Sequence, residues 1–307
     1  MNMIRVQNIS KKYGKLEALK GISFEVKEGE IFGLIGPDGA GKTTLFRILT
    51  TLMKPDSGEA SVLGLDIVGD YKKIRSRVGY MPGRFSLYQD LSVEENLQFF
   101  ASVFNTTINA NYELIKPIFS QLEPFKSRLA GALSGGMKQK LALSCALIHK
   151  PKMLFLDEPT TGVDAVSRKE FWDMLHRLKD EGISILVSTP YMDEAEQCDR
   201  IALIQQGSIL SIDTPDSITD QFDSNLWSVR ARDKFNLIQV LRDYEYSDSV
   251  QPFGESLHYT DKRADFNPKE LKSYLKNQDM SDAEVRSISP SIEDTFMRLM
   301  QQEAGHE

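Results

Sequence analysis

The sequence predicts a mixed α/β domain followed by a smaller α+β domain, and three observations support this. Short apolar segments such as residues 153–156 alternate with segments of helical pattern up to about residue 215, which is typical of parallel strands buried on both faces. A glycine-rich segment lies between one apolar run and a helical pattern. The turn-forming residues 213–217 mark a change in composition, which places the two domains at residues 1–215 and 216–307.

Strands dominate both ends of the first domain. Apolar and alternating patterns predict strands at residues 4–9, 21–26, 31–35 and 57–64, and later at 153–156, 183–188 and 200–204. A helix is predicted to begin near residue 45, directly after the glycine-rich segment.

The middle of the first domain is predicted to be mostly helical. We place a helical subdomain at about residues 85–148, after an irregular loop at Pro82, Gly83 and Arg84. Ser92 is followed three residues later by Glu95, which makes a capping box at the start of the first helix there.

The second domain is predicted to alternate strands and helices. The expected elements are a strand at 226–232, a helix at 234–243, strands at 247–252 and 255–261, a helix at 267–276, a strand at 284–288 and a helix at 291–301. The sequence contains no second phosphate-binding motif or internal repeat there. We therefore favour a role in stability or dimerisation, with no part in handling a substrate.

Composition is that of a soluble globular protein. The chain has 307 residues, of which 41% are hydrophobic and 26% charged. A net charge of −7 argues against general binding of nucleic acid, which usually needs a basic face. The two cysteines suggest a reducing compartment. No apolar run reaches the roughly 20 residues of a membrane span, so action at a membrane would require docking on another chain.

Residues 36–44 fit the pattern G-x-x-x-x-G-K-[ST] in the context that the motif needs, after a strand and before a helix. Glycines let backbone N–H groups point at phosphate oxygens, and the helix N-terminus adds partial positive charge. Lys42 is predicted to reach the outer phosphates and Thr43 to offer its hydroxyl to Mg²⁺. The predicted contacts to a nucleoside triphosphate are Gly36, Pro37, Asp38, Gly39, Ala40, Gly41, Lys42, Thr43 and Thr44.

Two acids end the strand at residues 153–156. Asp157 is predicted to support Mg²⁺, directly or through water, and Glu158 to polarise an attacking water. The alternative, a polar strand end before Pro159, is disfavoured by the phosphate-binding motif.

A third motif opens a predicted helix. Ser134, Gly135 and Gly136 form either a second anion-binding surface or an ordinary helix N-cap.

These motifs, in this order and spacing, with the sequence Pro-Thr-Thr-Gly-Val-Asp at 159–164, resemble the nucleotide-binding subunit of an ABC transporter over about residues 1–215. The resemblance implies a P-loop NTPase fold and a head-to-tail dimer that holds two ATP molecules between facing chains. It also implies that Tyr13 stacks on adenine and that Asp164 lies at the dimer interface. Ser134, Gly135 and Gly136 would contact the ATP held by the partner subunit.

The C-terminal segment 291–296, Ser-Ile-Glu-Asp-Thr-Phe, resembles a motif of exporters of the ABC-2 class. The segments 36–42 and 191–196 also resemble that class, in particular its members associated with multidrug efflux. In that class the ATPase and the integral-membrane permease are often separate chains. The resemblance implies a cytoplasmic protein held on the inner face of the cell membrane by its permease. We expect the face around Arg84, Phe85, Leu87 and Tyr88 to contact the permease, the alternative being a packed loop.

Three positions depart from the family pattern. Gly83 occupies a position that usually holds glutamine, and Pro190 one that usually holds a histidine near the γ-phosphate. Asp38 replaces the common asparagine. Two interpretations remain open: a heterodimer in which this chain's own ATP site turns over slowly, and a homodimer in which Glu158 and a nearby water suffice.

Two other classes of function remain as alternatives. One is a soluble ABC-type ATPase acting on ribosomes or DNA, which the single phosphate-binding motif and the lack of a long heptad run disfavour. The other is a non-catalytic, ATP-dependent regulator, which Gly83 and Pro190 would suit.

Overall fold

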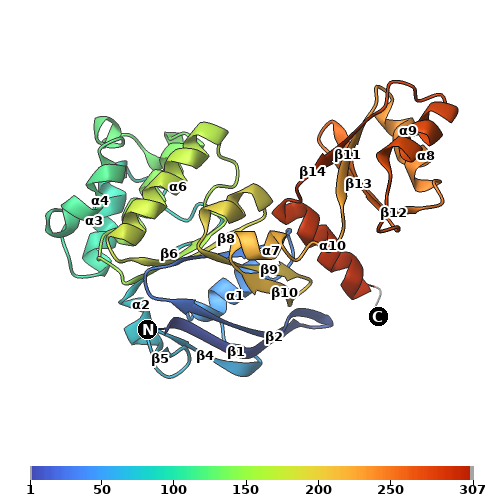
Figure 1. The fold of residues 1–307 in the computed structure, drawn as a ribbon. Coiled ribbons are helices and arrows are strands. Elements are labelled where there is room, and N and C mark those ends of the chain that lie inside the picture. Colours follow the sequence, from blue (N-terminus) through green and yellow to red (C-terminus); the bar gives the residue numbers. More distant parts are fainter. Residues whose placement is uncertain (1, 305–307) are drawn as a thin grey trace. The chain divides into compact units, whose positions relative to one another are not determined.

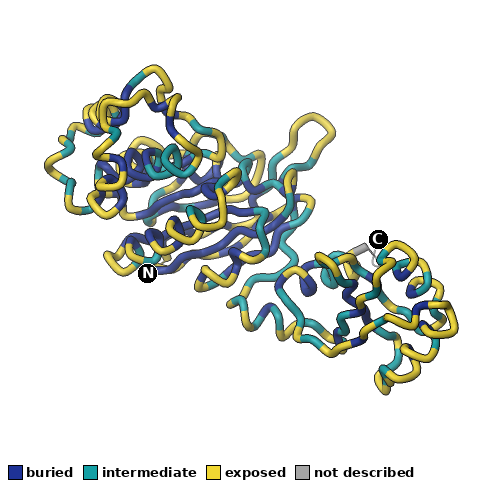
Figure 2. Tube along the Cα trace, turned by 90° about the horizontal axis from the view of Figure 1, so that it is seen from above, coloured by how far each residue is buried: buried dark blue, intermediate teal, exposed yellow. Residues whose placement is uncertain are grey.

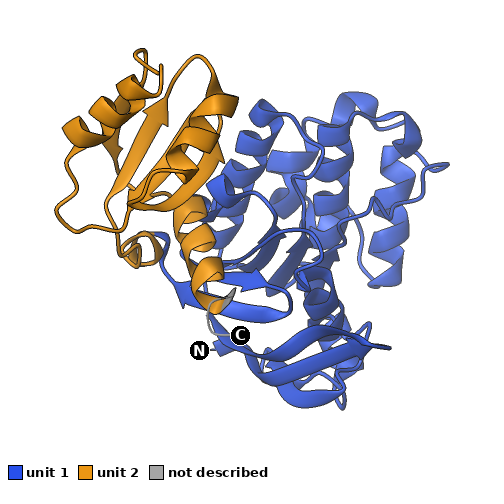
Figure 3. Cartoon of the chain, turned by 90° about the vertical axis from the view of Figure 1, so that its right-hand side faces the viewer, with its two compact units in different colours: residues 1–215, 306–307 blue, residues 216–305 orange. Residues whose placement is uncertain are grey.

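The computed structural model describes residues 2–304, and the chain divides into two compact units at Pro215 and Asp216 (Figure 3). Each unit has its own hydrophobic core. The following paragraphs describe the two units separately.

The first unit is built on a six-stranded sheet in the order β10-β9-β3-β8-β7-β6. Its strands are β3 (Ile31–Ile35), β6 (Val78–Met81), β7 (Met153–Asp157), β8 (Ser184–Thr189), β9 (Arg200–Gln205) and β10 (Ser208–Asp213). All neighbouring pairs from β9 to β6 are parallel, and only β10 is antiparallel. The strands β3, β7 and β8 are buried at every residue, which confirms the interpretation of the continuous apolar runs as doubly covered strands.

A second, antiparallel sheet has the order β2-β1-β4-β5. It consists of β1 (Asn2–Tyr13), β2 (Leu16–Lys27), β4 (Ser57–Val62) and β5 (Leu65–Asp66). The predicted strands at 4–9 and 21–26 lie within a much longer hairpin, whose register shifts between Val6 and Ile9. Such bulges increase the twist of a hairpin.

Helix α1 (Lys42–Leu49) lies between the two sheets (Figure 1). Its side chains Leu45, Phe46, Ile48 and Leu49 are buried in one cluster with residues of both sheets. Figure 2 shows the strands of the sheets around α1 as the most continuously buried part of the unit. The helix that begins at the glycine-rich segment is therefore fixed on two sides.

The helical part of the unit contains α3 (Val93–Val103), α4 (Tyr112–Phe119) and α5 (Gly135–Leu147), with short 3₁₀ turns at Asn109–Asn111, Glu123–Phe125 and Ala130–Ala132. The predicted capping box at Ser92 and Glu95 is confirmed, because each side chain bonds to the other residue's backbone N–H. The remaining elements are α2 (Tyr71–Arg75), α6 (Ala165–Asp180) and the 3₁₀ helix η4 (Met192–Gln197).

The second unit is an antiparallel sheet with helices. Its sheet has the order β12-β13-β11-β14. The elements are α7 (Pro215–Thr219) at the boundary, then β11 (Leu226–Arg230), α8 (Lys234–Arg242), β12 (Ser247–Phe253), β13 (Ser256–Asp261), α9 (Pro268–Asn277), β14 (Glu284–Ile288) and α10 (Ile292–Ala304). The order of strands and helices predicted for residues 226–301 is confirmed.

Candidate nucleotide-binding site

The glycine-rich segment 36–44 joins β3 to α1 and lies close to neighbouring backbone. A Cβ atom at Gly36 would stand 2.1 Å from the Ile204 carbonyl oxygen, and one at Gly41 would stand 2.5 Å from that of Ala18. Gly41 also has a φ of 106°, a conformation that favours glycine. It caps α1 without a side-chain hydrogen bond to the helix, so the first amides of α1 are available to an anion.

Lys42 is the central cation of this site. Its side chain is almost completely buried, and its Nζ donates to the carbonyl oxygens of Gly36 at 2.7 Å and Pro37 at 3.0 Å. The same Nζ lies 3.2 Å from Oε1 of Glu158. A buried ammonium requires such partners, and these bonds aim the charge into the loop.

A cavity of about 500 Å³ opens beside Lys42. Among the predicted residues, those that line it are Tyr13, Gly39, Gly41, Lys42, Thr43, Thr44 and Glu158. The structure adds Lys15, Leu16, Glu17, Ala18, Lys20 and Gln206, which sequence reasoning missed. The dipeptide Gln206-Gly207 is a turn signal that could have indicated a loop between β9 and β10, but not its approach to the cavity.

Tyr13 stands at the end of β1 and is 43% exposed. Its hydroxyl group donates to Sδ of Met53 at 3.0 Å. The ring therefore offers an accessible aromatic surface at the rim of the cavity, as stacking on a planar base requires.

The two acids at the end of β7 are held by β8. Asp157 is buried, and its Oδ1 accepts a hydrogen bond from Oγ of Ser188 at 2.7 Å. The backbone N–H of Glu158 donates to both Oγ and the carbonyl oxygen of Ser188, each at 3.0 Å. Glu158 has a φ of 52°, which is strained for a residue other than glycine and persists only where surrounding bonds enforce it.

Two of the three positions that depart from the family pattern, Gly83 and Pro190, lie next to this arrangement. A Cβ atom at Gly83 would stand 3.0 Å from the carbonyl oxygen of Asp157 and 3.7 Å from Cβ of Glu158. Pro190 directly follows Thr189, whose carbonyl oxygen accepts from the N–H of Gly36 at 3.2 Å. Neither Gly83 nor Pro190 can contribute a side-chain hydrogen bond there.

Ser134, Gly135 and Gly136 begin α5 and do not line the cavity beside Lys42. Ser134 accepts from the Met137 N–H at 3.4 Å, so it caps the helix. A Cβ atom at Gly136 would meet the Ser167 side chain at 3.0 Å, which brings the start of α5 against the start of α6.

Asp164 caps α6. Its Oδ1 accepts from the N–H groups of Val166 at 3.1 Å and Ser167 at 3.0 Å. The hydrogen bond from the Ser167 amide lowers the pKa of Asp164 below its ordinary value.

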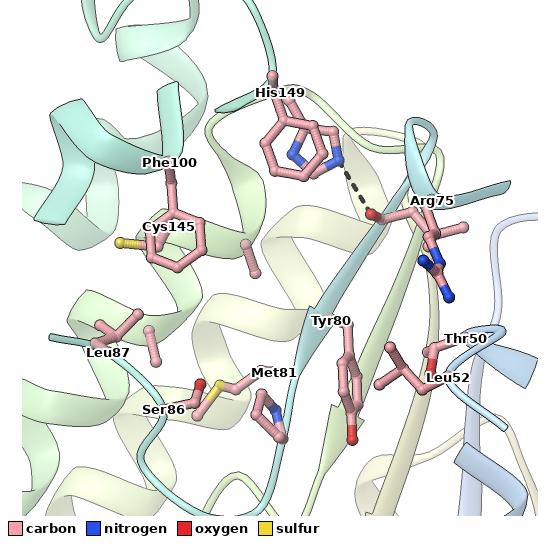
Figure 4. Close-up of a pocket in the computed structure, with 15 residues that line it drawn as sticks. Thr50, Leu52, Arg75, Tyr80, Met81, Ser86, Leu87, Phe100, Cys145 and His149 are labelled. Carbon is pink, nitrogen blue, oxygen red and sulfur yellow. Dashed lines mark hydrogen bonds between the residues drawn. The ribbon is translucent and has the colours of Figure 1, made fainter. Parts of the chain in front are cut away.

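A second, mainly apolar cavity of about 230 Å³ lies between β6 and the helical part (Figure 4). Phe100, Cys145 and Leu87 are on one side of it, and Tyr80 and Leu52 on the other. Leu87 is buried, which corrects the prediction that it lies on an exposed face. Its aliphatic side chain lines this apolar cavity instead.

Polar groups at the edge of this second cavity are constrained. Nε2 of His149 lies 3.0 Å from the carbonyl oxygen of Val78, and the ring stacks on Phe104 with centroids 3.7 Å apart. Burial raises the pKa of Tyr80 to about 12, and the charge of Asp157 contributes to the rise. The phenol therefore stays neutral at ordinary pH.

Among residues 2–304, no three His, Cys, Asp or Glu side chains form a group that could hold a metal ion by themselves. Across the same residues, no helix has the length and apolar character needed to cross a membrane.

A strand, a glycine loop that exposes helix amides, a buried lysine and a strand-end acid together define a nucleoside-triphosphate-binding fold. Comparison with protein families agrees, because residues 19–161 match the model described as ABC transporter.

Curated relatives agree as well. The chain is 43% identical over 221 residues to the probable multidrug ABC transporter ATP-binding protein YbhF of Escherichia coli (strain K12), covering 71% of this chain but only 38% of the relative's length. It is 34% identical over 301 residues to the Nod factor export ATP-binding protein I of Burkholderia lata, covering 96% of both chains.

Solved structures share the fold of the first unit. The ATP binding subunit of an ABC transporter superimposes with a TM-score of 0.65 at 29% identity, covering 72% of this chain and 93% of that one. The dimeric cassette MJ0796, in a post-hydrolysis state bound to ADP and Pi, gives a TM-score of 0.63 at 26% identity, covering 69% and 98%. The chain belongs to the ABC transporter family, among its ATP-binding proteins.

Proposed function

We propose that this chain is the ATP-hydrolysing subunit of an ABC-type membrane exporter. The observation that carries the proposal is the approach of Lys42 and Glu158 at the mouth of the glycine loop, where Nζ and Oε1 lie 3.2 Å apart. A cation for the outer phosphates and a carboxylate for water thus meet at one point, as phosphoryl transfer to water requires.

Each residue of the cavity has a distinct role in this proposal. Amides at the start of α1 bind the phosphates, and Lys42 neutralises their charge. Tyr13 stacks on the base, and Gln206 and Lys20, which line the same cavity, border the nucleotide. Glu158 orients and polarises the attacking water.

The donor set suits Mg²⁺. Thr43 and Asp157 offer one hydroxyl and one carboxylate, and Mg²⁺ usually completes its octahedron with water and substrate phosphates. That requirement fits a site without a ready-made cluster of three metal-ligating side chains among residues 2–304. Bound Mg²⁺ would supply charge neutralisation on the phosphates.

ATP is proposed to bind between two such subunits. Ser134, Gly135 and Gly136 lie outside the cavity beside Lys42, so they are free to contact ATP held by a facing subunit. Asp164, at the start of α6, lies at the same interface. The dimeric state of MJ0796 with ADP and Pi supports this arrangement.

The rate at which this chain's own site hydrolyses ATP distinguishes a homodimer from a heterodimer. Gly83 and Pro190 remove two side chains of the family pattern, a glutamine that contacts Mg²⁺ and the attacking water and a histidine that contacts the γ-phosphate. Loss of one such contact costs on the order of 3 kcal/mol, or about a hundredfold in rate. We favour neither arrangement: either a partner subunit supplies the fast site, or Glu158 and water suffice.

The apolar cavity beside β6 is the proposed contact for the permease. It is lined by Tyr80, Leu87 and Phe100. Tyr88 and Phe99, the sequence neighbours of Leu87 and Phe100, are exposed, and their ring centroids lie 4.8 Å apart. A short apolar helix end of the permease would fill such a cavity. Export is proposed because the curated relatives are named for multidrug transport and Nod factor export; the exported compound is a property of the permease.

The test is Mg-ATP hydrolysis by the purified chain, compared with its Glu158→Gln variant and with Glu181→Gln, an exposed control on the turn after α6. Turnover that only Glu158→Gln abolishes would support the proposal and a working homodimer. Tight ATP binding with negligible turnover would favour a regulator or a heterodimer. Recovery of turnover on adding a second nucleotide-binding subunit would decide for the heterodimer, and co-purification with a permease would support the exporter over the regulator.

A further inference from the structure

A buried carboxylate lies behind the candidate site, on an element that the proposed function leaves without a role. Glu194 belongs to η4 and is only 4% exposed. Its Oε2 accepts two hydrogen bonds, from Oγ1 of Thr160 at 3.0 Å and from Oγ1 of Thr189 at 2.6 Å. One oxygen atom therefore joins two segments that lie far apart in the sequence.

Those two threonines flank the residues assigned to catalysis. Thr160 is buried and lies two positions after Glu158. Thr189 is buried at the end of β8, and its carbonyl oxygen accepts from the N–H of Gly36. Glu194 thus fixes the loop that follows the catalytic acid relative to the strand end that contacts the phosphate loop.

The other carboxylate oxygen of Glu194 connects to α6. Oε1 lies 3.8 Å from a terminal guanidinium nitrogen of Arg168 and has no hydrogen-bond partner among the described residues. The Arg168 guanidinium also lies 3.5 Å from Oδ2 of Asp193 and stacks over the ring of Tyr191 at 4.9 Å. Its backbone N–H donates to the carbonyl oxygen of Asp164 at 2.9 Å.

This arrangement is costly if stability is its only purpose. Burying a carboxylate carries a desolvation penalty that paired groups often only balance, and leaving one oxygen incompletely bonded adds to it. An apolar side chain of similar size would fill the space without that penalty. Buried polar groups of this kind are better explained by the geometry that they enforce.

We propose that Glu194 is a positioning residue for ATP hydrolysis, an inference that rests on the proposed function. It holds the turn at Thr160, and with it the strained backbone of Glu158, in register with the end of β8. The hydrogen bond from Thr189 to Glu194 is important in this chain because the next residue, Pro190, cannot anchor the end of β8. Proline has neither a backbone N–H nor a side-chain donor. Through Arg168 the same carboxylate connects the site to the start of α6.

The test compares Glu194→Gln with Glu196→Gln, a matched change at an exposed residue of the same short helix. The glutamine keeps the shape but presents an amide where two hydroxyl groups now donate to one carboxylate. We expect kcat to fall about ten- to hundredfold, as small misplacements of catalytic groups do, with the KM for ATP within about twofold and the thermal midpoint within a few degrees. Glu196→Gln should behave as the wild-type chain does.

A second measurement guards against a purely structural effect. Thr189→Val removes one of the two hydroxyl donors and should lower kcat in the same sense. If both act through one bond, the Thr189→Val/Glu194→Gln variant should be no slower than the slower single variant. Fully additive losses, or losses of kcat that only follow a lower melting temperature, would overturn the positioning role.

The outcomes also separate this inference from the proposed function. Full activity of Glu194→Gln in a chain that hydrolyses ATP would overturn the role of Glu194 alone. No hydrolysis by the wild-type chain, even with its permease and a second nucleotide-binding subunit, would overturn both.

Discussion

The two units differ in the surroundings of their buried polar groups. In the first unit, Lys42, Glu158 and the amides of α1 meet at a cavity of about 500 Å³, with capacity left to bind a charged ligand. In the second unit, the buried side chains of His258 and Asp294 bond to each other and line a cavity of only about 70 Å³. Comparison of the two shows that burial of charged groups by itself does not indicate a site; the difference lies in the size of the cavity beside them and in whether unused donors accompany it.

The polar cluster of the second unit holds α10 to the sheet. Nδ1 of His258, on β13, lies 2.6 Å from Oδ1 of Asp294, and Phe253 stacks on the histidine ring. Oδ2 of Asp294 accepts from the N–H and Oγ of Ser291 at 2.8 and 2.6 Å. The motif at residues 291–296, noted in the sequence, therefore begins a helix and fixes it in place.

The largest effect is expected at the centre of the first unit. Lys42→Ala removes the buried cation, so ATP binding should weaken and turnover should fall by on the order of a hundredfold or more. Hydrolysis assays and nucleotide titration measure both, with Lys54→Ala as the control at an exposed lysine. Retention of tight binding by Lys42→Ala would break the contrast between the units.

The next effect is expected in the second unit and on stability alone. His258→Ala leaves the Asp294 carboxylate buried without this partner, which should cost about 1–3 kcal/mol. Trp227 lies in β11, and with Trp172→Phe it is the single tryptophan of the chain, so its fluorescence reports unfolding of this unit in urea. Glu293→Gln is the matched control on α10.

ATP turnover in the His258→Ala variant sharpens the comparison further. If the second unit has no part in hydrolysis, kcat at a temperature where both proteins are folded should be unchanged. A fall in kcat without unfolding would show that the two units do not divide binding and scaffolding as described.

A smaller gain is expected from Pro190→His. An imidazole there can donate to the γ-phosphate, and turnover at saturating ATP should rise by about tenfold, equivalent to about 1.4 kcal/mol in the barrier. Pro190→Ala separates the added imidazole from the removed ring. No difference between the two variants would count against a site slowed by Pro190. The corresponding change at Gly83 is less clean, because a Cβ atom there stands 3.0 Å from a backbone oxygen.

The smallest effect concerns pH. The Ser167 amide keeps the pKa of Asp164 below the ordinary value of 3.8, so ionised Asp164 contributes to stability above that pH. The contribution is lost as the pH falls through the lower folded-state pKa. Asp164→Asn retains a capping side chain without titrating. The difference in melting temperature between the two proteins should therefore change with pH only in that acid range, and a difference that changes near neutral pH would contradict this account.

Local patterns were sufficient for much of the fold. The glycine segment between β3 and α1, the doubly covered strand β7 and the element order of the second unit each depend on residues that are neighbours in sequence. The same holds for Lys42 and Glu158, because a phosphate loop and a strand-end acid meet at one edge of a parallel sheet.

Contacts between distant segments were not predictable in this way. Gln206 reaches the cavity because β9 pairs with β3, a pairing with no local signal. Leu87 is buried because α3 and α5 pack over its loop, although its sequence context resembled an exposed turn. Thr160, Thr189 and Glu194 come together only once β7 and β8 are paired.

The positive φ of Glu158 lowers the stability of the fold at a position where the proposed chemistry needs a carboxylate. Backbone strain at one such residue costs on the order of 1–3 kcal/mol, and glycine would relieve it. Replacing this glutamate by glycine would therefore raise the thermal stability of the chain and, under the proposed function, abolish ATP hydrolysis. Under the proposed role of Glu158, the backbone strain after β7 serves the reaction, so stabilising substitutions should be sought elsewhere in the molecule.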